Sequence, residues 1–364
     1  MKIKEVIEEL ELWAPITYQE SYDNSGLIVG DKEIEITGAL ICLDSIEEVI
    51  DEAITKKCNL VIAHHPIVFS GLKTFVGKDY IQRTIIKAIK NDIAIYAIHT
   101  NLDHVIDGVN SEICNRLGLV NQKILAPKKD LLSKLAVFVP KDHLDLVRNE
   151  MFKYGAGSIG KYDECSFVTQ GEGSFRASDN SKPHVGEIGE RHYEAEVKIE
   201  VIVPNYRLHK VIGRMIAVHP YEEVAYDIHP MQNTLSEVGS GMIGNLEKEE
   251  NILDFLARVK ETFKAGAIKY TSVAENPTVK TVAVCGGSGS FLLNNATAQK
   301  ADVFITSDFK YHQFFDGKGI VIADIGHFES EQFTIELIGR RLKEKFTTFA
   351  VHFTKVNTNP VNYL

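Results

Sequence analysis

Short apolar runs alternate with amphipathic stretches at both ends of the chain. Near the N-terminus, SIEEVIDEAITKK and YIQRTIIKAIKND place apolar residues at the spacing of one helix face. Apolar runs separated by such helices predict buried parallel strands joined by crossover helices. The alternation returns near the C-terminus, so both ends predict an α/β fold. The expected strands are 38–44, 60–66, 93–100, 281–287, 301–308 and 319–327.

The middle of the chain has a different pattern. Between about residues 131 and 230, strand-like runs such as YEAEVKIEVIVP interleave with the helix-like stretches DHLDLVRNEMFKYGAG and YRLHKVIGRMIAVHP. This order indicates a small α+β unit of the ferredoxin-like kind. The predicted fold is therefore a discontinuous α/β core with a mainly parallel sheet, plus an inserted ferredoxin-like domain. The predicted boundaries are 1–128 and 236–364 for the core and 129–235 for the insert.

Composition and charge narrow the functional classes. A chain of 364 residues exceeds a typical single domain, and 44% apolar residues suffice for a sizeable core. The net charge of −10 argues against a broad nucleic-acid interface, which needs a basic face. The N-terminus lacks the apolar segment of a signal peptide, and no apolar run has the length of a membrane span. Five scattered cysteines fit neither a disulfide framework nor a zinc ribbon, so we expect a cytoplasmic protein without membrane association.

Polar residues that can bind metal follow the expected core strands. In open parallel sheets, ligand sites form beyond the carboxyl ends of the strands, so these side chains are expected close together. Adjacent strand residues point to opposite faces, and His64 and His65 therefore suit two ions better than one. Glu331 lies four residues after His327 and can share its side of a helix. The polar residues of this edge are Asp44, His64, His65, His99, Asp103, Asp308, His327 and Glu331.

A mixture of imidazole and carboxylate donors favours zinc, iron or manganese over calcium or magnesium. We therefore predict two divalent transition-metal ions per subunit, with a carboxylate able to bridge them. The predicted ligands are His64, His65, Asp103, His327 and Glu331. The alternative is structural, because a single strand-end histidine usually has a structural role and acidic residues at a helix N-terminus are favoured by the helix dipole.

Several motifs resemble those of the GTP cyclohydrolase type 2 homologue family, also called the Nif-three-like dinuclear metal-centre family. They are ESYDNSGLIVGD, AHHPIVFSGLK, IHTNLDHVIDGVN, GGSGS and IGHFESE, in the family's order. The middle stretch, with GEGSFR and HPYEEVAYD, is similar to the CutA-like insert of the longer bacterial members. The resemblance implies that His64 and His327 hold one ion, that His65 and Asp103 hold the other, and that Glu331 bridges them. It also implies a homohexamer whose metal sites face an internal cavity.

Other residues are weaker candidates for substrate binding or acid–base chemistry. The backbone amides of Gly286, Gly287 and Ser288 can cradle a phosphate, although a tight glycine turn explains them equally well. Asn24 lies either in a turn packed at the sheet edge or in the pocket. The histidines of the insert share no strand edge, so HPYEEVAYDIHP is interpreted as a strand with its turns. The candidates for acid–base or supporting roles are His99, Asp308 and His312.

Two functions follow from these predictions. Two adjacent ions bridged by a carboxylate can activate water and polarise a substrate oxygen, so the first is a metal-dependent hydrolase. Its substrate is expected to be a nucleotide or another phosphate-bearing small molecule, and the family name implies GTP ring opening. The second is a metal-dependent regulatory or scaffold protein without turnover, whose insert senses a ligand or partner. A metal-dependent rate with nucleotides or phosphoesters distinguishes the two.

Overall fold

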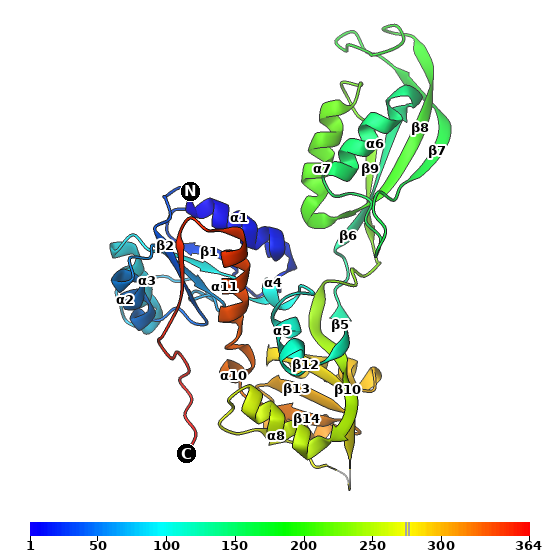
Figure 1. Cartoon of the computed structure of the whole chain (residues 1–364). Helices are drawn as coiled ribbons and strands as arrows, with labels where there is room; N and C mark the ends of the chain where they lie inside the picture. Colours follow the sequence, from blue (N-terminus) through cyan, green and yellow to red (C-terminus); the bar gives the residue numbers. More distant parts are fainter. Residues whose placement is uncertain (274, 276) are drawn as a thin grey trace. The chain divides into compact units, whose positions relative to one another are not determined.

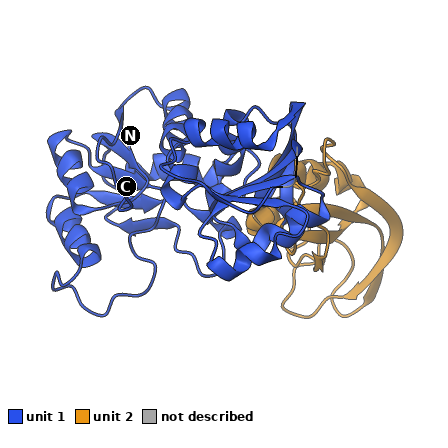
Figure 2. Ribbon diagram, turned by 90° about the horizontal axis from the view of Figure 1, so that it is seen from below, with its two compact units in different colours: residues 1–127, 237–364 blue, residues 128–236 orange. Residues whose placement is uncertain are grey.

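The chain is described by a computed structural model that covers residues 1–273, 275 and 277–364 (Figure 1). It has a mixed α/β fold with several sheets and packs as two compact units (Figure 2). Unit 1 comprises Met1–Pro127 and Glu237–Leu364, and unit 2 comprises Lys128–Ser236. Within the described residues, none of the helices combines the length and the apolar character that a bilayer crossing requires.

The first sheet of unit 1 is five-stranded. Its strands and crossover helices are β1 (Gly26–Val29), β2 (Gly38–Cys42), α2 (Glu47–Thr55), β3 (Leu60–Ala63), α3 (Tyr80–Lys90), β4 (Ala94–Ala97) and β15 (Ala350–Phe353). The order is β1-β4-β3-β2-β15, in which only the edge strand β1 is antiparallel to its neighbour. The apolar runs of β2, β3 and β4 are buried along their whole length, because helices cover the faces of a parallel sheet.

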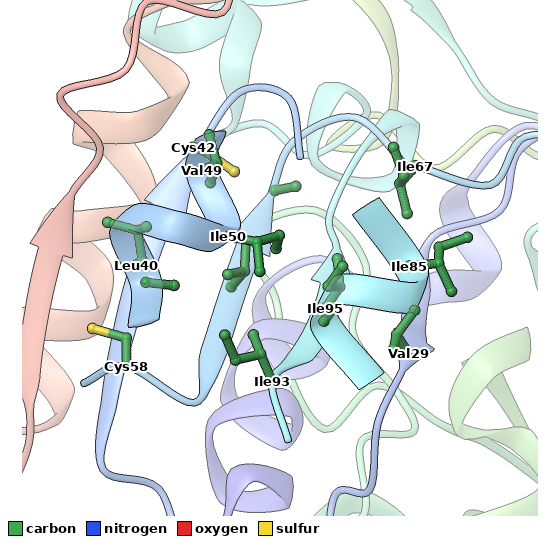
Figure 3. Close-up of a cluster of buried hydrophobic side chains, with 14 residues drawn as sticks. Val29, Leu40, Cys42, Val49, Ile50, Cys58, Ile67, Ile85, Ile93 and Ile95 are labelled. Atoms are coloured by element: carbon green, nitrogen blue, oxygen red, sulfur yellow. The ribbon is translucent and has the colours of Figure 1, made fainter. Parts of the chain in front are cut away.

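The helices α2 and α3 help to form a hydrophobic core beside this sheet. Leu40 of β2 and Ile95 of β4 belong to the same cluster as Val49 and Ile50 of α2 and Ile85 of α3 (Figure 3). Burial of each such side chain contributes about 1.5–3 kcal/mol to stability. The cluster thereby fixes the carboxyl ends of β3 and β4, from which three of the predicted metal ligands follow.

The second sheet of unit 1 is six-stranded and mixed. Its strands are β5 (Val120–Pro127), β10 (Gly239–Asn251), β11 (Lys269–Tyr270), β12 (Thr278–Ser288), β13 (Val303–Ser307) and β14 (Val321–Asp324). They lie in the order β11-β14-β13-β12-β10-β5, and only β12, β13 and β14 are parallel. The core therefore contains two sheets where one mainly parallel sheet was expected. Periodicity predicts single strands, but it does not say which strands pair.

The remaining elements of unit 1 are short helices and the helices that cover the sheets. They are α1 (Ile3–Trp13), η1 (Ile16–Tyr18), α4 (Thr100–Asp103), α5 (Val109–Arg116), α8 (Ile252–Thr262), η3 (Ser290–Leu292), α9 (Leu293–Ala298), η4 (Tyr311–Asp316), α10 (His327–Glu331) and α11 (Thr334–Lys345). Two of the shortest, α4 and α10, begin just after β4 and β14. The predicted ligand Asp103 ends α4, and the predicted ligands His327 and Glu331 begin and end α10.

Unit 2 consists of one four-stranded antiparallel sheet and two principal helices. Its elements are β6 (Leu132–Pro140), η2 (Lys141–His143), α6 (Leu144–Lys153), β7 (Phe167–Arg176), β8 (Arg191–Pro204), α7 (Asn205–Val218) and β9 (Tyr226–Met231). The strand order is β7-β8-β6-β9. Alternate residues of β6 and β8, such as Leu135 and Ile199, form a core with Val147 and Met151 of α6 and Val211 of α7.

The chain leaves and re-enters unit 1 at neighbouring positions. The strand β5 ends at Pro127, β10 begins at Gly239, and these two residues are direct partners in the second sheet. Segments inserted into a domain are tolerated where their two ends lie close together. This pairing therefore explains how a unit of more than a hundred residues interrupts unit 1 without disrupting its sheet.

Candidate metal centre

Three segments of unit 1 bring the five predicted ligands together. His64 and His65 directly follow β3, and Asp103 is the last residue of α4, which follows β4. His327 and Glu331 are the first and last residues of α10, which follows β14. All three strands belong to the parallel parts of their sheets and contribute residues beyond their carboxyl ends, as expected for α/β sites.

The carboxylate of Glu331 lies at the centre of this cluster. Its Oε2 is 2.9 Å from Nε2 of His65 and 3.1 Å from Nε2 of His327. Its Oε1 is 3.8 Å from Nε2 of His64. Glu331 and His64 are buried, with 3% and 0% of the residue exposed. The two oxygens of one buried carboxylate therefore face different imidazoles, which is the arrangement of a bridging ligand.

The distances define three groups of possible metal donors among the described residues. Glu331 belongs to two of them, one with His65 and His327 and a second with His64 and Asp103, and the third group consists of His64, His65 and His99. In the second group, Oδ1 of Asp103 is 3.7 Å from Nε2 of His64. These distances differ from the pairing that the resemblance implies, which is His64 with His327 and His65 with Asp103. His64 and His65 do not point to opposite sides as predicted, because their ring centroids are 4.9 Å apart and the Nε2 atoms of both face Glu331.

Each histidine of the two groups that contain Glu331 has its Nδ1 engaged outside the cluster. A neutral imidazole whose Nδ1–H donates a hydrogen bond has a free Nε2 that can bind metal. These outer partners therefore select the tautomer and the ring orientation that a metal ligand needs. The contacts are His64 Nδ1 with the Ile98 carbonyl oxygen at 2.8 Å, His65 Nδ1 with Asp44 Oδ1 at 2.8 Å, and His327 Nδ1 with Asp308 Oδ2 at 2.6 Å.

The electrostatics of the cluster favour a cation. Burial and the neighbouring Glu331 carboxylate raise the pKa of Asp103 to about 7. Burial lowers the pKa of His65, but hydrogen bonds with Asp44 and Glu331 outweigh it and raise the pKa to about 9. Burial likewise opposes protonation of His327, yet Glu331 and Asp308 raise its pKa to about 11. Because the carboxyl groups of Asp103 and Glu331 lie within ligand distance of each other, positive charge near them is favourable.

Two buried polar atoms of the cluster lack hydrogen-bond partners among the described residues, namely His64 Nε2 and Asp103 Oδ1. An unpaired buried donor or acceptor lowers the stability of a protein by about 1–3 kcal/mol. Both atoms belong to the same candidate ligand group and lie 3.7 Å apart. A metal ion between them would satisfy both, and the mixed imidazole–carboxylate donors fit zinc, iron or manganese.

A glycine lies directly beside the Glu331 carboxylate. A Cβ on Gly287 would lie 2.4 Å from Oε1 of Glu331, and Gly287 has a positive φ of 61°. The amides of Gly286 and Gly287 donate hydrogen bonds to Asn110 Oδ1 and Ser330 Oγ, at 2.9 and 3.0 Å. These amides are therefore engaged within the protein and do not face a phosphate. The glycines instead give Glu331 room to approach β12.

The cluster opens into a cavity of about 410 Å³. Its lining includes the aromatic side chains of Tyr22, Phe69 and Phe291, and the rings of Tyr22 and Phe69 stack with centroids 6.3 Å apart. No lysine or arginine lines the cavity in the part of the chain that the structure describes. The cavity therefore combines aromatic surface with a group of imidazoles and carboxylates.

The structure separates the weaker sequence candidates. Asp308 supports His327, and His99 lines the cavity within ligand distance of His64 and His65. Gly286 and Ser288 also line it. His312, by contrast, is exposed in η4 against the rings of Tyr311 and Phe315, outside this lining.

Asn24 also lies outside the lining of the metal-centre cavity. Its side chain donates to the carbonyl oxygen of Val68 at 2.7 Å, and it borders a different hollow. The neighbouring Asp23 was not singled out from the sequence. It accepts hydrogen bonds from Nδ1 of His99 at 2.7 Å and from the backbone N–H of Thr100 at 3.0 Å. Burial opposes its ionisation, but the contacts with His99 and Thr100 lower its pKa, and it remains an anion that orients His99.

The fold and this cluster define a mixed α/β protein with a histidine and carboxylate centre suited to metal. Comparison with known proteins names the family. The sequence profile of the Duf34/NIF3 family (NGG1p interacting factor 3) matches residues 1–360, and the chain belongs to this family.

The similarity to individual members covers nearly the whole chain. The chain is 38% identical to the GTP cyclohydrolase 1 type 2 homolog of Bacillus subtilis (strain 168), over 99% of this chain and 98% of that protein. Among solved structures, the Bacillus cereus protein related to NIF3 is 35% identical with a TM-score of 0.86, over 100% of this chain and 99% of that one. Staphylococcus aureus protein SA1388 is 29% identical with a TM-score of 0.79, over the same shares.

Proposed function

We propose that this chain binds two metal ions and is a metal-dependent hydrolase of a nucleotide or another phosphate-bearing small molecule. The observation that carries the proposal is the position of the buried Glu331, whose two carboxylate oxygens face two groups of donors. His65 and His327 would hold one ion with Oε2, and His64 and Asp103 the other with Oε1. Zinc, iron or manganese fit these donors.

The lining of the cavity supports a phosphate-bearing substrate with a planar ring. When bound, two adjacent divalent ions lower the pKa of water and polarise a phosphoryl oxygen. No lysine or arginine among the described residues of the lining supplies a permanent positive charge for a phosphate. Tyr22, Phe69 and Phe291 offer ring faces on which a base can stack, and each stacked base is worth about 1–3 kcal/mol.

His99 is the proposed proton acceptor. Its Nδ1 contacts the Asp23 carboxylate, so the ring is held in the tautomer whose Nε2 accepts a proton. Asp23 would also stabilise the imidazolium that forms when His99 takes up a proton. Two observations support this role for His99: it lines the cavity, and its Nδ1 contacts the Asp23 carboxylate.

The test is turnover by the purified, metal-loaded chain with a panel of nucleotides and phosphoesters. We expect a metal-dependent rate that Glu331→Gln abolishes and that His99→Gln lowers by about 10²–10⁴-fold. His312→Ala is the matched control, because this histidine lies outside the cavity, and it should retain the full rate. A rate that persists after complete removal of metal would contradict the proposed hydrolase.

The alternative is a metal-dependent regulatory or scaffold protein without turnover. It is favoured by the separate packing of unit 2, which contains a cavity of its own. Stoichiometric metal binding with no rate on any nucleotide or phosphoester, under conditions that keep the ions bound, would support this alternative over the hydrolase.

We propose further that unit 2 is an inserted ferredoxin-like domain and that the protein is a cytoplasmic homohexamer. The order β6-α6-β7-β8-α7-β9 and the antiparallel sheet support the first point, and membership of the family supports the second. Replacing residues 131–234 with a short Gly/Ser linker should leave unit 1 soluble and metal-bound. Light scattering of the full chain should give the mass of six copies. A metal-free unit 1 would overturn the proposal of an inserted domain. An assembly of fewer than six copies would overturn the proposal of a homohexamer.

A further inference from the structure

Unit 2 contains a cavity of about 510 Å³, a volume typical of small-molecule sites. It is formed by the end of β7 and the loop after it, by β8, and by the turn that precedes β9. Two motifs of the sequence, GEGSFR and HPYEEVAYD, supply much of its lining. Every residue of this lining belongs to unit 2, so the cavity is independent of the candidate metal centre.

His219 sets the conformation of the HPYEEVAYD turn. Its Nδ1 accepts a hydrogen bond from the backbone N–H of Tyr221 at 3.1 Å, so its Nε2–H must donate to the carbonyl oxygen of Phe138 at 3.0 Å. Burial lowers the pKa of His219, in agreement with this neutral tautomer. Both nitrogens are therefore used by the backbone, and His219 positions the ring of Tyr221 rather than binding a ligand.

Aromatic rings surround this turn. The Tyr221 ring centroid is 5.2 Å from that of His219, 6.1 Å from that of His184 and 6.3 Å from that of Phe175. Tyr221, His184 and Phe175 all line the cavity. Ring faces and edges at these distances favour planar aromatic ligands, because stacking adds to the burial of apolar area.

Glu196 places a carboxylate in the strand wall of the cavity. Glu196 of β8 lies against Gly173 of β7, where a Cβ would be 2.2 Å from its Oε2, so this glycine makes room for the carboxylate. The buried hydroxyl of Tyr221 lies beside Glu196 and makes no short, well-aligned hydrogen bond among the described residues. Burial and the neighbouring Glu196 raise the pKa of this phenol, which therefore stays protonated and can donate.

The charges at the edge of the cavity nearly cancel. Arg176 and Lys182 line it together with Glu222 and Glu223, and Glu222 Oε1 already accepts a hydrogen bond from the backbone N–H of Lys182 at 2.7 Å. A strongly charged ligand is therefore not favoured. Recognition is left to the aromatic rings, the Glu196 carboxylate and the Tyr221 hydroxyl.

We propose that this cavity binds a planar nitrogen heterocycle that presents two adjacent N–H donors to Glu196, as the base of guanosine does. A carboxylate accepts two parallel hydrogen bonds, and such charge-assisted pairs are about twice as strong as neutral ones. The phenol of Tyr221 donates to an acceptor on the same ring. Adenosine has an unprotonated ring nitrogen beside its amino group, where guanosine has an N–H. This nitrogen and the Glu196 carboxylate are both acceptors, so no hydrogen bond can form between them.

The test is calorimetric titration of the full chain with guanosine and, separately, with adenosine. We expect guanosine to bind at least about ten-fold more tightly than adenosine, and Glu196→Gln to remove at least about ten-fold of this affinity. Gly173→Ala should have a similar effect, because its Cβ displaces the carboxylate. Tyr221→Phe should cost about five-fold, the value of one neutral hydrogen bond.

Glu200→Gln is the matched control, since Glu200 lies on the same strand and contacts Lys134 and Lys198 outside the cavity. It should bind guanosine like the original chain, and all variants should keep their unfolding temperature within a few degrees. The titration is repeated in Glu331→Gln, which disables the metal centre and should not affect this site.

Three results would overturn the proposal. One is the absence of guanosine binding at millimolar concentration. Another is binding that Glu331→Gln removes and Glu196→Gln leaves intact, because the nucleoside would then occupy the metal-centre cavity. The last is a change of oligomeric state in Glu196→Gln and Gly173→Ala without a change in guanosine affinity, which would make this cavity a contact between copies of the chain.

Discussion

Histidines gather in both units, but only those of unit 1 form candidate metal sites. In unit 1, backbone and carboxylate oxygens hold the Nδ1 atoms, and the Nε2 atoms of His64, His65 and His327 face Glu331. In unit 2, the rings of His143 and His184 lie 5.7 Å apart, and both nitrogens of His219 are used by the backbone. No group of three metal-binding side chains occurs among the described residues of unit 2.

The difference lies in the buried carboxylates rather than in the number of histidines. Asp103 and Glu331 lie in the protein interior close to one another, which is unfavourable unless a cation balances them. The imidazoles of unit 2 pack against aromatic rings and backbone oxygens, which need no metal. A metal site is thus defined by shared acceptors at ligand distance, and histidines alone do not indicate one.

The largest expected effect is the loss of both ions from Glu331→Gln. This change removes the acceptor that the two donor groups share. The metal content measured by elemental analysis should therefore fall from about two ions per chain to nearly none. Glu329→Gln is the control on the same helix, because Glu329 is buried but belongs to neither group. Retention of one ion in Glu331→Gln would show that this carboxylate does not bridge.

Single-ligand variants sharpen the comparison by testing the pairing of donors. His327→Ala and His65→Ala should each remove one ion, and the double variant should remove no more, because both residues serve the same site. His64→Ala should remove the other ion, so that His64→Ala combined with His327→Ala leaves none. His184→Ala in unit 2 should retain both ions. If His327→Ala and His64→Ala affected the same ion, the pairing by distance would be wrong.

Metal binding should weaken in acid, and this follows from the protonated histidines of the cluster. The pKa of His65 is about 9 and that of His327 about 11 in the metal-free protein, so both are protonated at neutral pH. Binding at Nε2 must displace both protons, and the apparent affinity of this site should fall by about 100-fold per pH unit. Calorimetry in buffers of different ionisation enthalpy should detect about two protons released. A constant affinity between about pH 6 and pH 8 would contradict this protonation state.

A smaller effect is expected from the carboxylates behind the ligands. Asp308→Asn weakens the acceptor of the His327 Nδ1–H and should lower the metal affinity of that site by about 10–100-fold. Asp44→Asn should act in the same way through His65. Competition with a chelator of known affinity measures both. Asp142→Asn, beside His143 of unit 2, is the control and should change nothing. Equal affinities in all variants would mean that the outer carboxylates do not tune the site.

Much of the metal centre was predictable from local rules. The shared side of His327 and Glu331 follows from the four-residue spacing on a helix. The two-residue period of a strand predicted opposite directions for His64 and His65, but both residues lie beyond the end of β3 and their rings are close together. The parallel strands β2, β3, β4, β12, β13 and β14 also coincide with the apolar runs. Periods of two to four residues depend only on backbone geometry, so a single sequence carries them.

Other features depended on which distant segments meet. The grouping of donors by distance differs from the pairing that the resemblance implies, because it depends on where α4 and α10 lie relative to the end of β3. Asp23, behind His99, comes from a segment without periodicity, and the aromatic lining joins residues as far apart as Tyr22 and Phe291.

The sequence by itself determined the residue types of the metal centre and the shared side of His327 and Glu331, because these follow from neighbours a few positions apart. Only the tertiary structure decided which donors lie at ligand distance from one another and which rings surround Tyr221. His184 and Phe175 are far from Tyr221 in sequence and meet it in unit 2 through a loop and a strand end. Such contacts depend on the packing of whole sheets and loops, which no local spacing encodes.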